Sequence, residues 1–534
     1  MRFKQQTSPC FTPLAVGALA VCLFATGREV SASEQQAQQP PAPATAPEGP
    51  TIALTADEAA KLALQNNLGL EAERLGPQVA SYGVAQARAA YAPTLSSTTS
   101  KSSSDRPPSD FLSGEAGSVL TSGSARSSVG IGQNVPWGGG QYSVSFLGTR
   151  STTSGFAAFN PNLGASLDAS YVQPLLRNFK TDGFRQQLQQ ARNTEQIADI
   201  ELRQRVTQVS RAARTAYYNL VSTISGLDLA QQSLELSREL LRNNQRKVEV
   251  GTMAPIDITE AEAEVARLEE SVIVAESQIR SAEDGLRLLL LNPSRPDFWT
   301  TKLVPAEQPT LEPKTIDVEA AVANAMQSRT DLAVFKKRLE STDINLEYLK
   351  NQKLPEVNLQ ANYGVVGVAG TQFDWDYSTL TIKNQSQRSF SEALRDVFGN
   401  DFRTWSLQFV VRYPVGTSQA DAALASARLQ RQQQLTNLRE AEMQIATQVR
   451  EAARQVTTGL QRVQSTKKAR ELSERRLQAE EKRLAVGLSD TFRVFQTQRD
   501  LAAAKRAELL AVLDYNRALV NFEAVQTVPL GGGQ

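Results

Sequence analysis

The residue types that usually carry enzymatic chemistry are scarce in this chain. Its 534 residues include no histidine, which removes the commonest general base and the commonest metal ligand. The two cysteines are Cys10 and Cys22, and no glycine-rich segment has the spacing of a phosphate-binding loop. The many Asp and Glu residues are better explained as solvated faces of long helices. The sequence therefore argues against an enzyme and predicts neither a cofactor nor a bound metal.

Charged residues instead follow two similar glycines. Asp257 and Glu260 stand six and nine positions after Gly251, one helical turn apart and so on one face. Arg493 stands six positions after Gly487. Carboxylates on one face can select cations or form ion pairs, and a guanidinium can pair with them. Because acids are also favoured in the first turn of any helix, a solvated helix start is the alternative.

Both glycines interrupt long helical patterns. One pattern runs from Pro174 to Val250 and the other from Pro414 to Val486, and each is followed by a helix of about half that length. Each long pattern contains an apolar seam with spacings of 4, 3, 4, 3 and 4, which is typical of a left-handed coiled coil. The seams are Leu202, Val206, Val209, Ala213, Ala216 and Leu220 in the first, and Ile445, Val449, Ala452, Val456, Gly459 and Val463 in the second.

Two other regions alternate apolar and polar residues, as strands do. They cover about 94–174 and 355–414, and each lies between a half-length helical pattern and a long one. The strand regions follow helices at 54–91 and 316–352. We expect the aromatic segment around Phe373, Trp375 and Tyr377 to be a loop.

The order helix, strands, long helix, turn and half-length helix occurs twice, so the chain is predicted to be two internal repeats. We assign 51–300 to the first repeat and 301–527 to the second, with a flexible tail at 528–534. Two half-length helices together match one long helix. We therefore expect 256–291 and 316–352 to stack end to end beside a long helix, and 54–91 to stack on 491–525.

The N-terminus has the features of a secretory signal. Two basic residues precede an apolar run at 14–25, which is too short for a typical membrane span, and 30–32 is a plausible cleavage site. We assign 1–32 to the signal and the Gln-, Pro- and Ala-rich stretch 33–50 to a disordered linker. A weak lipobox leaves lipidation of Cys22 as an alternative.

These patterns together indicate an exported protein. The chain has 57 basic and 56 acidic residues, so nothing suggests a nucleic-acid partner. No stretch after the signal resembles a transmembrane helix. One chain offers about four to six strands, and a membrane barrel needs at least eight. If the strands enter a membrane, several chains must share one barrel, which points to an outer-membrane tube.

The chain resembles the TolC-like outer-membrane factors (the outer membrane efflux protein family) over about 51–527. The similar segments include Leu54 to Ala59, Ala63 to Asn67, Gln173 to Leu176 and Arg329 to Leu332. The most specific are the two turns, in which Val250, Gly251 and Thr252 and then Val486, Gly487 and Leu488 resemble the family's repeated Val-Gly-Leu/Thr tip.

The resemblance implies a homotrimer with a shared outer-membrane barrel of about four strands per chain, continued by a long periplasmic coiled-coil barrel. It implies that the two turns dock on a periplasmic adaptor linked to an inner-membrane pump. Acids near the tip ring the entrance in the family, so Asp257 and Glu260 are aperture candidates. We hypothesise that Arg493, which departs from that pattern, latches the entrance by pairing with one of them.

A second departure is the length of the first strand region, where 127–149 has the pattern of an extra hairpin. It either extends the barrel to 18 strands per trimer or folds outside it, and we expect it outside. The predicted function is a passive exit duct for efflux or type I secretion, in contact with outer-membrane lipid. The alternative is a structural coiled-coil scaffold of the cell envelope.

Overall fold

The computed structural model describes most of one compact unit, Gly49–Gln534. The described residues are 50–108, 118–252, 254–307, 311–376, 378–379, 381–416 and 418–528. The predicted signal at 1–32, nearly all of the linker and nearly all of the tail lie outside these residues. No helix in the described ranges combines the length and apolar composition needed to cross a bilayer.

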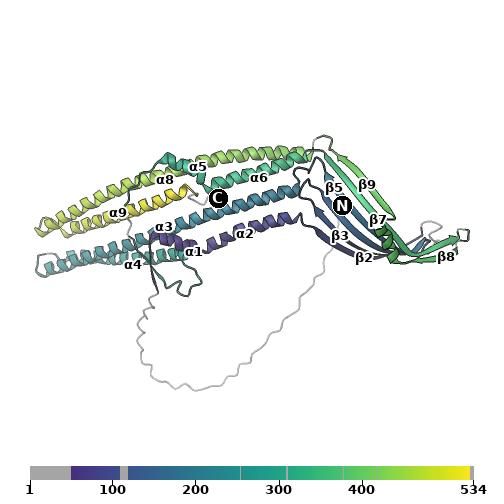
Figure 1. The fold of residues 1–534 in the computed structure, drawn as a ribbon. Helices are drawn as coiled ribbons and strands as arrows, with labels where there is room; N and C mark the ends of the chain where they lie inside the picture. Colours follow the sequence, from purple (N-terminus) through teal and green to yellow (C-terminus); the bar gives the residue numbers. More distant parts are fainter. Residues whose placement is uncertain are drawn as a thin grey trace, which may run out of the picture. The chain divides into compact units, whose positions relative to one another are not determined.

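The helices of the two predicted repeats correspond in order and length (Figure 1). The first repeat contains β1 (Thr51–Leu54), α1 (Ala56–Asn66), α2 (Leu68–Ala89), α3 (Gly183–Glu249) and α4 (Ile256–Leu290). The second contains β6 (Lys302–Pro305), α5 (Val318–Ser328), α6 (Thr330–Gln352), α8 (Gln419–Ala485) and α9 (Thr491–Val525). The helices α3 and α8 each have 67 residues, and α4 and α9 each have 35. The long helices are therefore about 100 Å long at 1.5 Å per residue.

Local capping explains where several helices begin. Thr55 and Glu58 form a capping box at the start of α1, and the Asn67 side chain caps α2. The single helix expected at 54–91 is therefore two helices preceded by a short strand. The first long helix begins at Gly183 rather than near Pro174, because Asp182 caps its backbone there. The strands β1 and β6 form a parallel pair that the sequence did not predict.

The half-length helices meet differently from our expectation. Asn66 Nδ2 donates to the Leu290 carbonyl at 2.8 Å, so the α1–α2 end meets α4. The Thr330 amide donates to the Thr527 carbonyl at 3.0 Å, so the α5–α6 junction meets the end of α9. Each repeat thus stacks its own two half-length segments, and the predicted stacking of 54–91 on 491–525 is wrong. Helix length alone fitted either pairing, and only contacts between distant residues distinguish them.

The predicted seams form the interior of the helical region. Val209, Ala213 and Leu220 are buried in one apolar cluster with residues of α1 and α4. Ile445, Val449 and Ala452 are buried against α5 and α9. Figure 1 shows α4 alongside α3 and α9 alongside α8, and both pairs make extensive contacts.

One seven-stranded sheet adjoins the helices (Figure 1). Its order in the described residues is β2-β3-β4-β5-β7-β8, with β9 also paired to β7. The strands are β2 (Thr94–Arg106), β3 (Leu120–Asn134), β4 (Gln141–Thr153), β5 (Phe159–Pro174), β7 (Glu356–Asp376), β8 (Thr381–Arg388) and β9 (Arg403–Arg412). The expectation of about four strands is too low. The extra hairpin is β3–β4, and it lies inside the sheet, so our expectation that it folds outside is wrong.

The register places most apolar side chains of β3, β4, β5, β7 and β9 on one face, to which β2 contributes only Leu95. Residues opposite one another in antiparallel strands point to the same side. One row of such residues is Leu95, Ile131, Val144, Ala169, Tyr363 and Trp405. The adjacent row is Ser96, Gly130, Ser145, Asp168, Gly364 and Thr404. Alternation in the sequence therefore gives a largely apolar face and a polar face that extend from β3 to β9.

A helix that the sequence did not predict covers part of the apolar face. Helix α7 (Phe390–Gly399) packs on β5 and β7, where its Ala393 and Val397 join an apolar cluster. Phe373 and Trp375 belong to β7 rather than to the predicted loop, and Tyr377 lies outside the described residues. Helix α7 packs closely on the sheet because Gly367 has no side chain. A Cβ on Gly367 would lie 2.1 Å from the Ala393 carbonyl oxygen.

Gly367→Ala is therefore expected to displace α7. The added methyl meets backbone that cannot move as a side chain can, and overpacking of this kind costs about 1–3 kcal/mol. We expect faster protease cleavage between β7 and β9 and a lower midpoint of thermal unfolding. Gly132→Ala is the control, because the nearest atom to its new Cβ is an ordinary 3.6 Å away. Equal cleavage rates for the two variants would contradict the close packing of α7.

Candidate functional site

The first predicted tip is a helix C-terminus closed by glycine. The Gly251 amide donates to the Val248 carbonyl at 2.9 Å, and the Thr252 amide donates to the Lys247 carbonyl at 2.8 Å. These two bonds define a Schellman motif, which needs a left-handed residue at the glycine. Gly251 has φ of +79°, and no atom lies within 4 Å of a Cβ built on it. Backbone conformation, rather than crowding within the chain, requires glycine here.

The second tip has the same hydrogen bonds. The Gly487 amide donates to the Leu484 carbonyl at 3.2 Å, and the Leu488 amide donates to the Arg483 carbonyl at 2.9 Å. Gly487 has φ of +77°. Val250, Val486 and Leu488 are 77%, 70% and 78% exposed. Each tip therefore presents apolar side chains to its surroundings beside a backbone that a partner can approach closely.

The two tips differ in the side chains that support them. Glu480 is only 7% exposed, and its carboxylate accepts hydrogen bonds from Ser489 and Arg483 across the second turn. The Ser489 hydroxyl, aided by the charges of Arg483 and Arg493, holds the pKa of the Glu480 carboxyl below its usual value. The position seven residues before Gly251 is instead Asn244, which is fully buried and whose amide atoms have no protein partner among the described residues.

The two tips also differ in how the helix that follows each glycine is capped. The Asp490 side chain accepts from the Arg493 amide at 2.8 Å and caps α9. Helix α4 begins after Pro255, which provides no side-chain cap. The second tip is thus held by side-chain hydrogen bonds on both sides of its glycine. At the first tip the Thr252 hydroxyl donates to the Lys247 carbonyl at 2.9 Å, and no side chain caps α4.

Ser489→Ala is expected to loosen the second tip selectively. Because the folded-state pKa of Glu480 is lowered, its contribution to stability is complete above its unfolded pKa and is lost as pH falls through the folded value. We therefore expect amide hydrogen exchange at 483–493, corrected for intrinsic rates, to rise several-fold in the variant and in wild type under acid. Exchange at 247–257 should not change. Similar changes at both tips would contradict the inference that the Ser489–Glu480 hydrogen bond stabilises only the second tip.

The charged aperture candidates lie just beyond the tips. Asp257 is half-buried in the first turn of α4, and Glu260 is exposed. Within the chain, Arg493 pairs with Asp490 at 3.7 Å. The predicted pairing of Arg493 with either acid concerns neighbouring chains as well, so it stays a prediction.

An ion pair between the two repeats lies one turn farther along α4. Arg499 of α9 approaches Glu264 of α4 at 3.9 Å, and Arg267 also pairs with the same carboxylate. The side chain of Glu264 is only 11% exposed. Sequence reasoning missed this contact. In the sequence, Glu264 cannot be distinguished from the many solvated acids of the helices, so its position did not indicate a buried ion pair.

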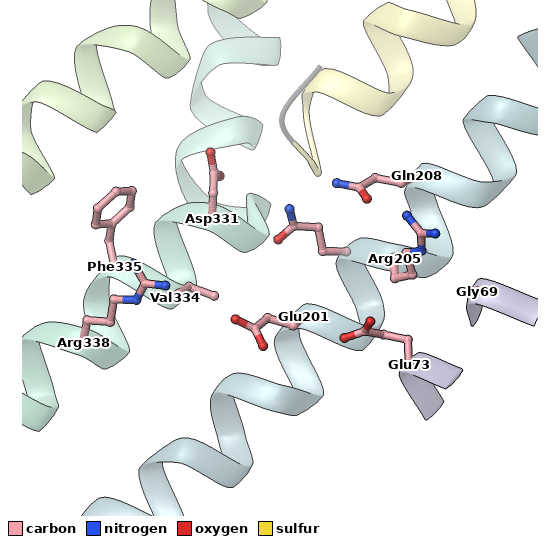
Figure 2. Close-up of a pocket in the computed structure, with 10 residues that line it drawn as sticks. Gly69, Glu73, Glu201, Arg205, Gln208, Asp331, Val334, Phe335 and Arg338 are labelled. Atoms are coloured by element: carbon pink, nitrogen blue, oxygen red, sulfur yellow. The ribbon is translucent and has the colours of Figure 1, made fainter. Parts of the chain in front are cut away.

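A hollow of about 470 Å³ lies where α2, α3 and α6 come together (Figure 2). Figure 2 shows Glu73 from α2, Glu201 and Arg205 from α3, and Asp331 and Arg338 from α6 around it. Its charges are mixed, and no group of acids, Cys or His in the described residues is arranged to hold a metal. We assign no ligand to this hollow.

Arg329 in the Arg-Thr-Asp-Leu segment has a structural role. It is 2% exposed, and its guanidinium binds both carboxylate oxygens of Asp331 at 2.9 and 2.6 Å. It also donates to Gln448 of α8 and to the Val525 carbonyl of α9, both at 3.0 Å. One side chain therefore joins the α5–α6 junction to both α8 and α9.

Comparisons with known proteins agree with this geometry. Residues 321–525 match a family model described as outer membrane efflux protein. A comparison with curated protein sequences found no match. Among solved structures, the chain is similar to the Campylobacter jejuni CmeC outer membrane channel, with 13% identity and a TM-score of 0.63 over 88% of this chain and 85% of that one.

Two further solved structures show the same likeness. The Vibrio cholerae outer membrane protein VceC has 14% identity and a TM-score of 0.60, over 88% of this chain and 96% of that one. The open state of the Neisseria gonorrhoeae MtrE outer membrane channel has 16% identity and a TM-score of 0.59, over 89% of each chain. Identities this low establish the fold alone. Together with the match of residues 321–525 to the family model, they confirm the predicted resemblance to the TolC-like outer-membrane factors. The matched family is one of efflux proteins rather than of enzymes.

Proposed function

We propose that this chain is one subunit of a trimeric exit duct in an outer membrane, with a large periplasmic portion. The observation that carries the proposal is the pair of Schellman tips, each joining a 67-residue helix to a 35-residue helix. The helices lead from these tips to a sheet with one largely apolar and one polar face. An apolar outside and a polar lumen are what a membrane barrel requires. The duct is passive and serves efflux or type I secretion.

The tips are proposed as the docking site for a periplasmic adaptor that is linked to an inner-membrane pump. Their exposed Val250, Val486 and Leu488 offer apolar contacts. The glycines beside them carry no side chain, so another helix tip can reach the backbone. An envelope scaffold made only of coiled coils would not need paired strands that bring both repeats into one sheet, and this disfavours the alternative function.

Cysteine cross-linking in whole cells tests the proposal. Residues 49–534 contain no cysteine, so Thr252→Cys and Leu488→Cys introduce single reactive sites at the tips when Cys10 and Cys22 are serine. A bifunctional thiol–amine reagent should trap a periplasmic adaptor at either position. Recovery of the chain only from the cytoplasm, or failure to find trimers in outer-membrane fractions, would overturn the proposed function. Ile273→Cys, exposed in the middle of α4, is the control position.

For the aperture, we propose that Asp257 and Glu260 of three chains surround the entrance and that Arg493 restrains it by pairing with one of them. Arg493→Ala should then increase single-channel conductance and cation selectivity, because three guanidinium groups no longer balance the carboxylates. Arg499→Ala is the matched variant, since it breaks the pair between repeats within one chain. Unchanged conductance and unchanged dye leakage for Arg493→Ala would contradict the proposal that Arg493 restrains the entrance.

A further inference from the structure

The strand order gives the extra hairpin a role in the duct itself. We propose that β3 and β4 are wall strands, so that each chain contributes six strands (β2, β3, β4, β5, β7 and β9) and three chains close an 18-stranded barrel. This inference rests on the proposed function, because it requires that the sheet lie in a membrane. Since barrel diameter grows roughly linearly with strand number, the exit would be about 1.5 times as wide as that of a 12-stranded barrel.

The first support is that both strands of the hairpin are paired on both edges. Thirteen consecutive pairs join β2 to β3, from Thr94↔Gly132 to Arg106↔Leu120. The ladder between β3 and β4 is equally continuous, and β4 pairs with β5 from Gln141 to Ser151. The hairpin cannot leave the sheet without breaking two ladders, and it separates β2 from β5 completely.

The second support is that the apolar face continues over the hairpin. Val129 and Val144 are 47% and 37% exposed, and both belong to the face that carries the exposed Trp405 and Leu407 of β9. No described element covers these side chains as α7 covers the neighbouring cluster. Exposed apolar residues that form one band across β3, β4 and β9 are expected where lipid is the neighbour.

The third support is the opposite face of the hairpin, which is polar and small. Ser128, Ser143 and Ser145 occupy it, and the Ser143 hydroxyl hydrogen-bonds to the Ser170 hydroxyl of β5 at 2.8 Å. The two added strands thus extend the lumen surface with hydroxyl groups.

The turn of the hairpin is fixed to the helical region. Gly138 and Gly139 have φ of +70° and +66°, and a Cβ on Gly139 would lie 2.2 Å from the Asn178 carbonyl oxygen. Gln173 Nε2 donates to the Gly138 carbonyl at 2.7 Å. The turn therefore packs on the segment that leads from β5 into α3, which holds the hairpin in register with the wall.

The free edges allow the ring to close. Among the described residues, β2 pairs only with β3. The edge of β7 opposite β5 pairs with β9 near the helices and with β8 farther away. Successive wall strands alternate in direction, so β2 runs antiparallel to β9. An inserted pair of strands preserves this alternation. The β2 edge of one chain can then pair with the β9 edge of the next, which removes both edges.

Fluorophores on single cysteines test the placement of the hairpin. The lipid-facing variants are Val129→Cys and Val144→Cys, and their lumen-facing partners are Ser128→Cys and Ser143→Cys. Leu407→Cys and Ser406→Cys on β9 are the controls. The full chain, with Cys10 and Cys22 replaced by serine, is reconstituted in phosphatidylcholine vesicles. Quenching by spin-labelled lipid tails is compared with quenching by iodide in the water.

We expect lipid-tail quenching at 129, 144 and 407 to be at least twofold stronger than at 128, 143 and 406, and iodide quenching to show the reverse order. If only position 407 is quenched by lipid while 129 and 144 are quenched by iodide, the hairpin lies outside the wall. That result would overturn this inference but not the proposed duct function. If no position responds to lipid, including 407, the proposed membrane function fails as well.

Discussion

Leu488→Asp is expected to prevent adaptor docking while leaving the fold unchanged. Leu488 is 78% exposed, so the substitution should change the free energy of unfolding by no more than about 0.5 kcal/mol. A docked adaptor would bury the new carboxylate without a partner, at a cost of roughly 2–3 kcal/mol. That cost lowers the affinity about 30- to 150-fold.

Adaptor capture and export measure this effect separately from folding. We expect the cross-link from Thr252→Cys to the adaptor to be strongly reduced in the Leu488→Asp background, with dye export lost in parallel. Leu488→Met keeps an apolar side chain and serves as the control, with wild-type capture. Wild-type export by Leu488→Asp, with normal amounts of trimer in the membrane, would show that the second tip is not a docking surface.

Arg329→Ala is expected to have the largest effect on stability. The substitution leaves the Val525 carbonyl and the Gln448 side chain without this donor, and it removes the guanidinium that pairs with Asp331. Breaking a buried ion pair by removing one member costs about 3–5 kcal/mol. The midpoint of thermal unfolding of the purified protein should fall by several degrees. Increased amide exchange should centre on the α5–α6 junction and the end of α9.

An exposed arginine provides the matched control. Arg450 pairs with Glu319 at 2.9 Å, but these side chains are 52% and 75% exposed. Arg450→Ala should therefore cost at most about 1 kcal/mol. Arg329→Lys is also informative, because one ammonium cannot reproduce the two-pronged contact with Asp331 and still reach α8 and α9. A similar loss of stability for Arg329→Ala and Arg450→Ala would contradict the linking role of Arg329.

Residues whose conformation is decided locally were predicted well from the sequence. Gly251 and Gly487 were identified as turns, and both adopt the left-handed conformation that closes a helix. The seam around Val209 and its counterpart around Val449 were identified from spacing, and both are buried. Such features depend on helical periodicity and on backbone freedom, which residues near in sequence carry by themselves.

Contacts between distant residues were not predictable in the same way. Arg329 was noticed only for its resemblance to a family segment, and its bond to Val525 spans 196 positions. The hairpin β3–β4 was recognised as a hairpin, but strand alternation is identical whether a pair of strands lies inside a sheet or beside it. Helix α7 was missed because its short apolar pattern lies between strands. The surface on which it packs forms only when β5 and β7 lie side by side.

The long helices with their apolar seams, the alternating strands and the two glycine turns could be predicted from the sequence, because periodicity and backbone conformation are local. Contacts between distant residues were needed to show which half-length helices stack, that the hairpin lies between β2 and β5, and that Glu480 supports one tip while Asn244 lies buried at the other. Those outcomes depend on which surfaces meet, and on whether a polar group finds a partner when water is excluded.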